Sequence, residues 1–327
     1  MRRGFLWVLA AILMISCSFA QSLLARYSPF TSLTPTAYPS VTPIPVMALS
    51  TSTPDDPTAT PTPPCDPFTA FCVLDGHFFF QRPISPPNRV TAENSYLFGS
   101  TEEGVYEPHH GVDLPNATGT QVLAVADGTV VFAGSDDNTT IGPWTDFYGN
   151  VIIILHRLEG IPTPIYSLYG HLSEVDAVPG QAVHAGDLIG LVGSTGAAMG
   201  SHLHFEVRAG DNTYDNSTNP ALWLIPLEGK GVIAGRVVDE KSNMIHVKNL
   251  RIQFYPSDPS QANFALQVET YAPEQDHVSS DADLQENFAV GDLAAGRYRL
   301  VFEDRGVYDR WVEVQAGKLT YVEFVVR

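Results

Sequence analysis

Between residues 88 and 227 the chain is dense in β-branched residues and glycines and has almost no 3.6-residue hydrophobic period. Residues 122–134 read as two strands that turn at Asp127-Gly128, and residues 149–156 as a third strand. Glycines then separate short apolar pieces from Gly170 to Gly200. This pattern predicts an antiparallel sheet with tight turns and no long helix.

A new alternating pattern begins after residues 228–231 and predicts a second unit. Its short apolar-polar segments are residues 232–239, 250–255, 287–290, 296–302 and 320–326. Several short strands separated by turns indicate a β-sandwich. We therefore expect a mainly β protein, with an antiparallel sheet domain at residues 68–228 (core 88–227) followed by a sandwich at residues 231–327.

The first 67 residues have a different character. Positive charge at Arg2 and Arg3 precedes an apolar run that ends in small residues, which is typical of a bacterial export signal at residues 1–20. Cleavage after Ala20, lipid attachment at Cys17 and retention as a membrane anchor all stay open. Each of them places the rest of the chain outside the cytoplasm.

A linker is predicted at residues 21–67. Residues 28–67 hold 11 Pro, 9 Thr and 5 Ser, with no Lys, Arg or Glu. Such a segment buries too little apolar surface to fold alone. Cys65 and Cys72 close a short loop where an oxidising compartment allows pairing. A structural disulfide is favoured over two free thiols.

Composition narrows the function classes. The chain has 18 Lys+Arg against 36 Asp+Glu, a net charge of −18, which excludes a reader of nucleic-acid phosphates. Three Cys exclude a disulfide-dense scaffold and a four-Cys zinc site. The ten His are therefore the main candidates for catalytic or metal-binding residues.

Histidines cluster in three motifs: His109-x-x-x-Asp113, His171, and His202-x-His204. Alternate side chains of a strand share a face, so the last pair point together, and Asp113 returns to the face of His109 when the segment is extended. Two imidazoles and one carboxylate that meet leave a position for water, the arrangement of catalytic zinc. The remaining histidines are interpreted as ordinary surface or core residues: His77, His110, His156, His184, His246 and His277.

Further motifs extend this pattern: Phe98-Gly99, Gly119-Thr120-Gln121-Val122-Leu123-Ala124, Asp127-Gly128-Thr129-Val130, Tyr169-Gly170-His171-Leu172, Gly180-Gln181-x-Val183-x-x-Gly186, Gly190-x-Val192-Gly193-Ser194-Thr195-Gly196, His202-Leu203-His204-Phe205-Glu206-Val207-Arg208 and Asn219-Pro220. Their order and spacing resemble the lysostaphin/LytM-type zinc metallopeptidases, which cut peptidoglycan peptides. The resemblance implies a barrel-sandwich hybrid fold and an extracytoplasmic enzyme, either secreted or membrane-anchored.

The resemblance also implies roles for five residues. His109, Asp113 and His204 would ligate one zinc ion per chain. His171 and His202 would be the catalytic histidines that do not bind metal. No His-Glu-x-x-His helix is present, so these two would orient the attacking water, stabilise the oxyanion and protonate the leaving amine. The bond that is cut, in a glycine cross-bridge or in a stem-peptide cross-link, stays open.

Two departures from the family pattern are visible. Ser201 stands where Pro commonly precedes the His-x-His motif, and residues 136–148 form a longer loop that is expected to wall one side of the groove. Trp144 and Phe147 are expected to pin this loop, with stacking on substrate as the alternative.

Two other functions stay open. A LytM-like regulator would activate other wall hydrolases without turnover, although degenerate members of that kind usually lack metal ligands. A non-haem iron oxygenase also uses two His and a carboxylate, but the glycine framework argues against it. The C-terminal unit resembles carboxypeptidase regulatory-like or transthyretin-like sandwiches. Its expected role is spacing, or docking on wall polymer or a protein.

Overall fold

The computed structural model describes residues 65–256 and 263–327. The predicted export signal and residues 21–64 of the predicted linker lie outside the described residues. Everything described below belongs to one compact unit, residues 62–327. No helix in the described ranges combines the length and the apolar character that a membrane span requires.

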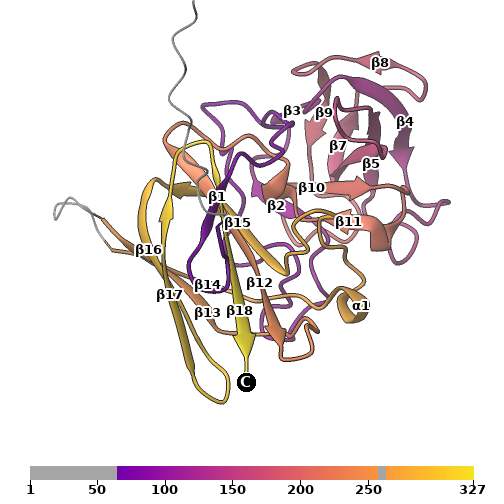
Figure 1. Ribbon diagram of the computed structural model, residues 1–327. Helices are drawn as coiled ribbons and strands as arrows, with labels where there is room; N and C mark the ends of the chain where they lie inside the picture. The colour runs from indigo at the N-terminus through magenta and orange to yellow at the C-terminus, as the bar shows by residue number, and fades with distance from the viewer. Residues whose placement is uncertain (1–64, 257–262) are drawn as a thin grey trace, which may run out of the picture. The chain divides into compact units, whose positions relative to one another are not determined.

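The first half of this unit is built on a seven-stranded antiparallel sheet in the order β11-β10-β6-β5-β4-β8, with β2 paired to the other part of β10 (Figure 1). A three-stranded sheet, β3-β9-β7, shares its buried core. The strands are β2 (Val112–Pro115), β3 (Gln121–Leu123), β4 (Gly128–Ser135), β5 (Asn150–His156), β6 (Ile165–Gly170), β7 (Leu172–Val175), β8 (Ala182–Val183), β9 (Leu188–Val192), β10 (His202–Ala209) and β11 (Ser217–Thr218). Two short 3-10 helices, η1 (Tyr214–Asn216) and η2 (Pro220–Leu222), flank β11.

The two strands expected to turn at Asp127-Gly128 exist but do not form a hairpin, which corrects that expectation. β3 pairs with β9, whereas β4 pairs with β5 and β8 in the other sheet. Residues 124–126 between them are buried, and Ala124 exchanges backbone hydrogen bonds with the Gly186–Asp187 turn. The chain therefore crosses from one sheet to the other, because both sheets cover the same core.

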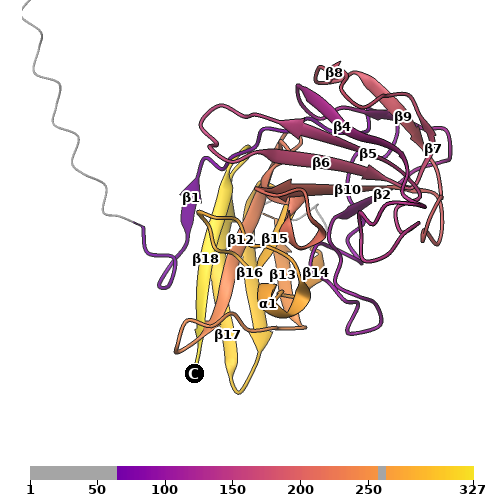
Figure 2. The same ribbon diagram turned by 90° about the vertical axis from the view of Figure 1, so that its right-hand side faces the viewer.

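The second half is a sandwich of two four-stranded sheets, β1-β18-β12-β15 and β14-β13-β16-β17 (Figure 2). Its strands are β1 (Cys72–Leu74), β12 (Lys230–Asp239), β13 (Leu250–Tyr255), β14 (Ala265–Val268), β15 (Phe288–Ala294), β16 (Gly296–Glu303), β17 (Val307–Val314) and β18 (Leu319–Val326). One helical turn, α1 (Pro273–Asp276), follows β14. The central strands β12 and β18 run parallel, and the other pairings are antiparallel.

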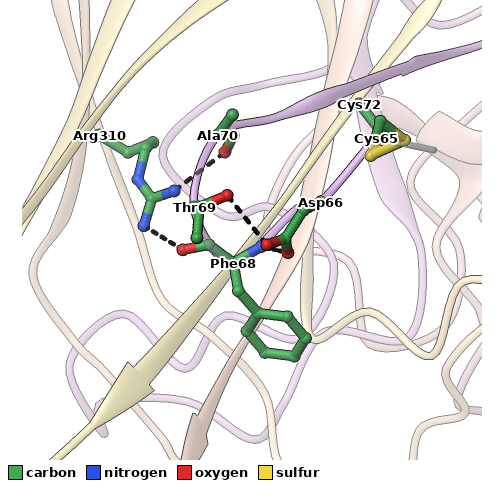
Figure 3. The surroundings of a disulfide bond; sticks show 7 residues. All are labelled: Cys65, Asp66, Phe68, Thr69, Ala70, Cys72 and Arg310. Carbon is green, nitrogen blue, oxygen red and sulfur yellow. Dashed lines mark hydrogen bonds between the residues drawn. A yellow bond between two sulfur atoms is a disulfide. The ribbon is translucent and has the colours of Figure 1, made fainter. Parts of the chain in front are cut away.

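The N-terminal strand belongs to the sandwich and not to the domain that begins at residue 68 in our prediction. β1 pairs with β18, and Phe71 packs against the sandwich core. Figure 3 shows the Cys65–Cys72 disulfide, which confirms the favoured pairing, beside the loop that it closes. Arg310 donates to the backbone oxygen atoms of Phe68 and Ala70 at 2.7 and 3.1 Å, so this loop is attached to β17.

One buried cluster spans the two halves, beside a second cluster that belongs mainly to the sandwich. Leu222, Trp223 and Leu224, which end the first half, lie in the same cluster as Val232, Ala289, Leu319 and Tyr321 of the sandwich. This shared core holds the sandwich against the sheet that carries the histidines.

Candidate metal centre and groove

Two antiparallel strands bring the candidate ligands together. β2 pairs with β10 so that Asp113 lies opposite His204, and His109 approaches the same point just before β2 begins. Between them, a Cβ at Gly111 would lie 2.5 Å from the Phe205 carbonyl oxygen and 2.9 Å from the His204 ring. Only glycine allows the two strands to approach this closely. His109, Asp113 and His204 each offer one ligand atom, and these atoms lie within 4.8 Å of one another.

The three atoms have the spacing of a zinc site. His204 Nδ1 lies 2.9 Å from Asp113 Oδ1, and His109 Nε2 lies 3.2 Å from His204 Nδ1 and 3.3 Å from Asp113 Oδ1. A tetrahedral zinc ion with bonds of about 2.0–2.1 Å separates its ligand atoms by about 3.3 Å. Two ring nitrogens and a carboxylate oxygen are ligands that zinc accepts, so these residues fit the ion.

Hydrogen bonds on the far side of each ring set which nitrogen faces this point. His109 Nδ1–H donates to the Tyr96 carbonyl oxygen at 2.8 Å. The Tyr96 ring stacks on the His109 ring at a centroid distance of 4.1 Å. His204 Nε2–H donates to Glu206 Oε1 at 3.1 Å. Because each far nitrogen donates away from the cluster, His109 Nε2 and His204 Nδ1 are the ring atoms that face the point where a metal would bind.

Glu206 is a fully buried carboxylate, and polar partners surround it. Arg208 Nε donates to Glu206 Oε2 at 2.8 Å, Tyr148 Oη donates to Glu206 Oε1, and Arg208 also donates to Tyr148 Oη at 3.0 Å. Burial raises the pKa of Glu206, but the Arg208 guanidinium and the His204 hydrogen bond outweigh it and hold the pKa at about 2. Glu206 is therefore ionised wherever the protein is folded at ordinary pH.

Two carboxylates make the centre favourable for positive charge. Burial lowers the pKa of His204, but its hydrogen bonds to Asp113 and Glu206 raise that pKa to about 9 when no metal is bound. Burial raises the pKa of Asp113, but the neighbouring His109 and His204 rings bring it well below its usual range. A metal cation would replace the His204 proton, and the same carboxylates would stabilise it.

His171 and His202 lie beside this cluster. Their ring centroids are 4.8 Å apart, and His202 Nε2 is 3.5 Å from Asp113 Oδ1. Each Nδ1–H donates to a backbone carbonyl oxygen, that of Thr195 at 2.8 Å for His171 and that of Gly200 at 2.9 Å for His202. Burial, with the neighbouring histidines, lowers the pKa of His171 to about 3, and burial lowers the pKa of His202. Both rings are thus neutral, with an Nε2 lone pair that can accept a proton.

The five residues lie in a groove of about 1110 Å³. As expected, the loop between β4 and β5 walls one side through Pro143, Trp144 and Phe147. Phe147 packs edge-on against Tyr148 and Tyr214, which pins the loop, whereas 52% of Trp144 is exposed. Acidic residues are spread around the groove, and among the described residues no Lys or Arg lines it. The acidic residues are Glu93, Glu102, Glu107, Asp113, Asp215 and Asp276.

Residues 107–218 match the model of peptidase family M23. The match includes the three candidate ligands and both neighbouring histidines. This segment of the chain is therefore similar to the M23 peptidases. Because its sheets are mainly antiparallel, the domain has the β architecture expected from the sequence.

The relatives of this chain include two named kinds. It is 40% identical over 100 residues to the DD-carboxypeptidase/endopeptidase Mpg of Neisseria meningitidis, a match that covers 31% of this chain and 20% of that protein. It is 35% identical over 127 residues to the murein hydrolase activator NlpD of Escherichia coli, covering 39% and 28%. The catalytic domain of lysostaphin from Staphylococcus simulans shares 28% identity over 40% of this chain and 86% of that domain, with a TM-score of 0.31. The matches thus span between a fifth and 28% of the length of the two curated relatives.

The residues that support the candidate ligands were not predicted from the sequence. Glu206 and Arg208 follow His204 at two-residue steps on β10, so the strand period placed all three on one face. The strand period alone therefore identifies Glu206 and Arg208 as neighbours of His204. Tyr96 and Tyr148 lie in irregular segments, where no period relates them to the histidines. His110, which was assigned no role, lines the groove with its Nδ1 close to Ser217 Oγ, at 2.8 Å.

Proposed function

We propose that the protein is a zinc-dependent endopeptidase that hydrolyses peptide bonds of peptidoglycan outside the cytoplasm. The observation that carries this proposal is that one nitrogen each of His109 and His204 and one oxygen of Asp113 face a single point in the groove. Two neutral histidines, His171 and His202, lie beside that point. The M23 match and the endopeptidase relative support it.

In this proposal His109, Asp113 and His204 hold the zinc ion. When bound, zinc supplies a Lewis acid that polarises the scissile carbonyl and makes water nucleophilic near neutral pH. The fixed hydrogen bonds from the two ligand histidines to Tyr96 and Glu206 keep the donor atoms in place before metal arrives.

His171 and His202 move the protons. Their free Nε2 atoms accept a hydrogen bond from the attacking water and orient it, because the opposite nitrogen of each ring is fixed on a backbone carbonyl. The proton taken up by one ring is then available for the leaving amine. A protonated ring also donates to the developing oxyanion.

Two further features support action outside the cytoplasm. The Cys65–Cys72 disulfide is typical of an oxidising compartment. The export signal that we predict at residues 1–20 would deliver the chain there, either secreted or attached to the membrane through its N-terminus. The substrate partner in this proposal is the peptide part of peptidoglycan.

A substitution series tests the role of each histidine. We expect His204→Ala to lose both zinc and activity, because it removes a ligand. His171→Ala and His202→Ala should keep most of the zinc and lose turnover by roughly 10²–10⁴-fold, the usual contribution of a general acid or base. Metal analysis of each purified variant, with counting of new amino termini from digested peptidoglycan, gives both readouts. Equal zinc loss in all three variants would contradict the assignment.

The named activator among the relatives favours one alternative, a regulator that stimulates another wall hydrolase without turnover. The same digestion separates the two functions. An endopeptidase releases new amino termini alone, whereas a regulator releases none and accelerates lysis only when a second hydrolase is added.

A further inference from the structure

One segment of the C-terminal sandwich contacts the groove on two sides. Residues 269–279, called here the bridging segment, run from the end of β14 through α1 (Figure 1). Gln275, Asp276 and His277 of this segment line the same groove as the histidine cluster. The sandwich therefore reaches the site directly.

Glu269, at the start of the bridging segment, accepts hydrogen bonds from the backbone of the loop at residues 101–106, which lines the groove. Its Oε2 accepts hydrogen bonds from the Thr101 amide at 2.7 Å and the Thr101 hydroxyl at 2.9 Å, and its Oε1 accepts from the Glu103 amide. The Gln267 side chain reaches Glu103 Oε1 at 3.2 Å from β14. Hydrogen bonds to a buried carboxylate are the strong kind, so this loop is fixed by the sandwich.

The loop needs such a clamp because its backbone is unfavourable. Glu102 and Glu103 have φ angles of 46° and 61°, in the left-handed region that residues with a side chain avoid. Such conformations persist only where the surroundings determine them, and they gather at functional sites. The loop carries Glu102 and Tyr106 into the groove.

The same loop is joined to a candidate ligand. His109 N–H donates to the Ser100 carbonyl at 3.0 Å, and Gly99 N–H donates to the His109 carbonyl at 2.7 Å. Tyr271 of the bridging segment packs on this turn: a Cβ at Gly99 would lie 2.4 Å from its ring, and Phe98 meets the ring edge-on at 5.3 Å. The bridging segment thus sets the position of the backbone beside His109.

The other end of the bridging segment attaches to the opposite side of the groove. Ser279 N–H donates to the Ser217 carbonyl at 2.8 Å, and Ser279 Oγ donates to the Asp215 carbonyl at 2.9 Å. Asp215 and its neighbour Tyr214 line the groove. One sandwich segment therefore connects both walls.

We propose that the C-terminal sandwich is part of the substrate site, in addition to the spacing or docking role expected from its sequence. Glu269 and Tyr271 position one wall, and Gln275 and His277 contact residues of an extended peptide beyond the scissile bond. This inference rests on the proposed function, since the peptide is that of the peptidoglycan substrate.

Two variants test the two parts of the inference. Glu269→Ala removes the clamp, and the exposed pair Gln275→Ala/His277→Asn removes the contacts; Asn tolerates the left-handed backbone of His277 at φ 55°. Glu323→Ala is the matched control, because Glu323 is as buried as Glu269, at 6% exposure, and pairs with Arg236 at 2.8 Å outside the groove lining.

We expect Glu269→Ala to raise KM for a soluble cross-linked peptidoglycan fragment by roughly tenfold or more, with zinc content unchanged and faster hydrogen exchange at the Thr101 and Glu103 amides. The double variant should raise KM for this fragment several-fold at constant kcat, the sign of lost uniform binding, and leave a short peptide substrate unaffected. The control should match the wild type. Unchanged KM in both test variants overturns the inference.

Failure of the proposed function is a separate outcome. If the wild type releases no new amino termini, binding of the same fragment is measured by calorimetry. Weaker binding by both test variants and normal binding by Glu323→Ala supports the inference without the peptidase activity. Equal binding by all variants, or none by the wild type, overturns it.

Discussion

At the scale of single residues, a buried ion pair determines how His204 faces the centre. Glu206 is fully buried, and a carboxylate in that position is stable only with partners. Arg208 donates to Oε2 and Tyr148 donates to Oε1, and Oε1 also accepts from His204 Nε2–H. The negative charge raises the electron-donating strength of the ring and selects the tautomer with a free Nδ1.

Glu206→Gln tests this arrangement. Glutamine keeps the size of the side chain and one oxygen for Arg208, but removes the charge, so we expect zinc affinity to fall about 10–100-fold. Competition with a chelator measures the Kd directly, without any activity assay. Exposed Glu159→Gln, on the same domain, is the control. An unchanged Kd for Glu206→Gln would show that the carboxylate does not tune the centre.

At the scale of elements, strands with a two-residue period were predictable and their partners were not. The expected segments 232–239 and 250–255 correspond to β12 and β13. The shared face of His202 and His204 also followed from the period, with Leu203 and Phe205 in the core. The turn at Asp127-Gly128 gave the right start for β4 but the wrong end for β3 and the wrong pairing, because the partner of a strand depends on distant residues.

β14 and β17 are among the strands that escaped prediction, for physical reasons. β17 carries Asp309, Arg310 and Glu313, and only Val312 and Val314 within it are buried. Its outer positions face solvent at the edge of the sheet, so the apolar period is weak. β14 is only four residues long and, apart from Val268, not buried. Tyr96 escaped for a similar reason, since its role depends on a loop that folds back onto His109.

A close contact between two loops helps to hold His171 in place. Gly149 has φ +67°, and a Cβ there would lie 2.4 Å from Thr195 Oγ1 and 2.5 Å from Gly196 N. The Thr195 carbonyl accepts from His171 Nδ1–H. Gly149→Ala should therefore lower the free energy of unfolding by about 2–4 kcal/mol and reduce kcat while the protein retains zinc.

Gly160→Ala is the matched control for that experiment. Gly160 has φ +80° and nothing within 4 Å of an added Cβ, so this variant shows the backbone cost alone, about 1 kcal/mol. Denaturant unfolding and zinc analysis of both variants separate the two contributions. Equal losses of stability and activity in the two variants would mean that the Gly149–Thr195 contact does not position His171.

At the scale of the whole described unit, the boundary near residue 228 divides the sequence but not the core. Residues 228–231 mark a change of pattern, and alternation shows which face of each strand is buried but not what covers it. In the structure Trp223 and Val232, on either side of that boundary, belong to one cluster. Arg82 of the first half also pairs with Asp292 of the sandwich at 2.6 Å.

A shared core predicts that both halves unfold together. We expect calorimetry of the full chain to show one transition for residues 65–327, with equal calorimetric and van't Hoff enthalpies.

Arg82→Ala removes the pair with Asp292 and a 2.8 Å hydrogen bond to the Ile225 carbonyl, at a site where both charged side chains are 15% exposed. It should lower the free energy of unfolding by about 1–3 kcal/mol and move the whole transition. Arg299→Ala breaks a more exposed pair with Asp309 inside the sandwich and should cost less than about 1 kcal/mol. Two separate transitions, or a shift of only one of them in Arg82→Ala, would mean that the halves are independent domains, and the groove could then not depend on the sandwich for its shape.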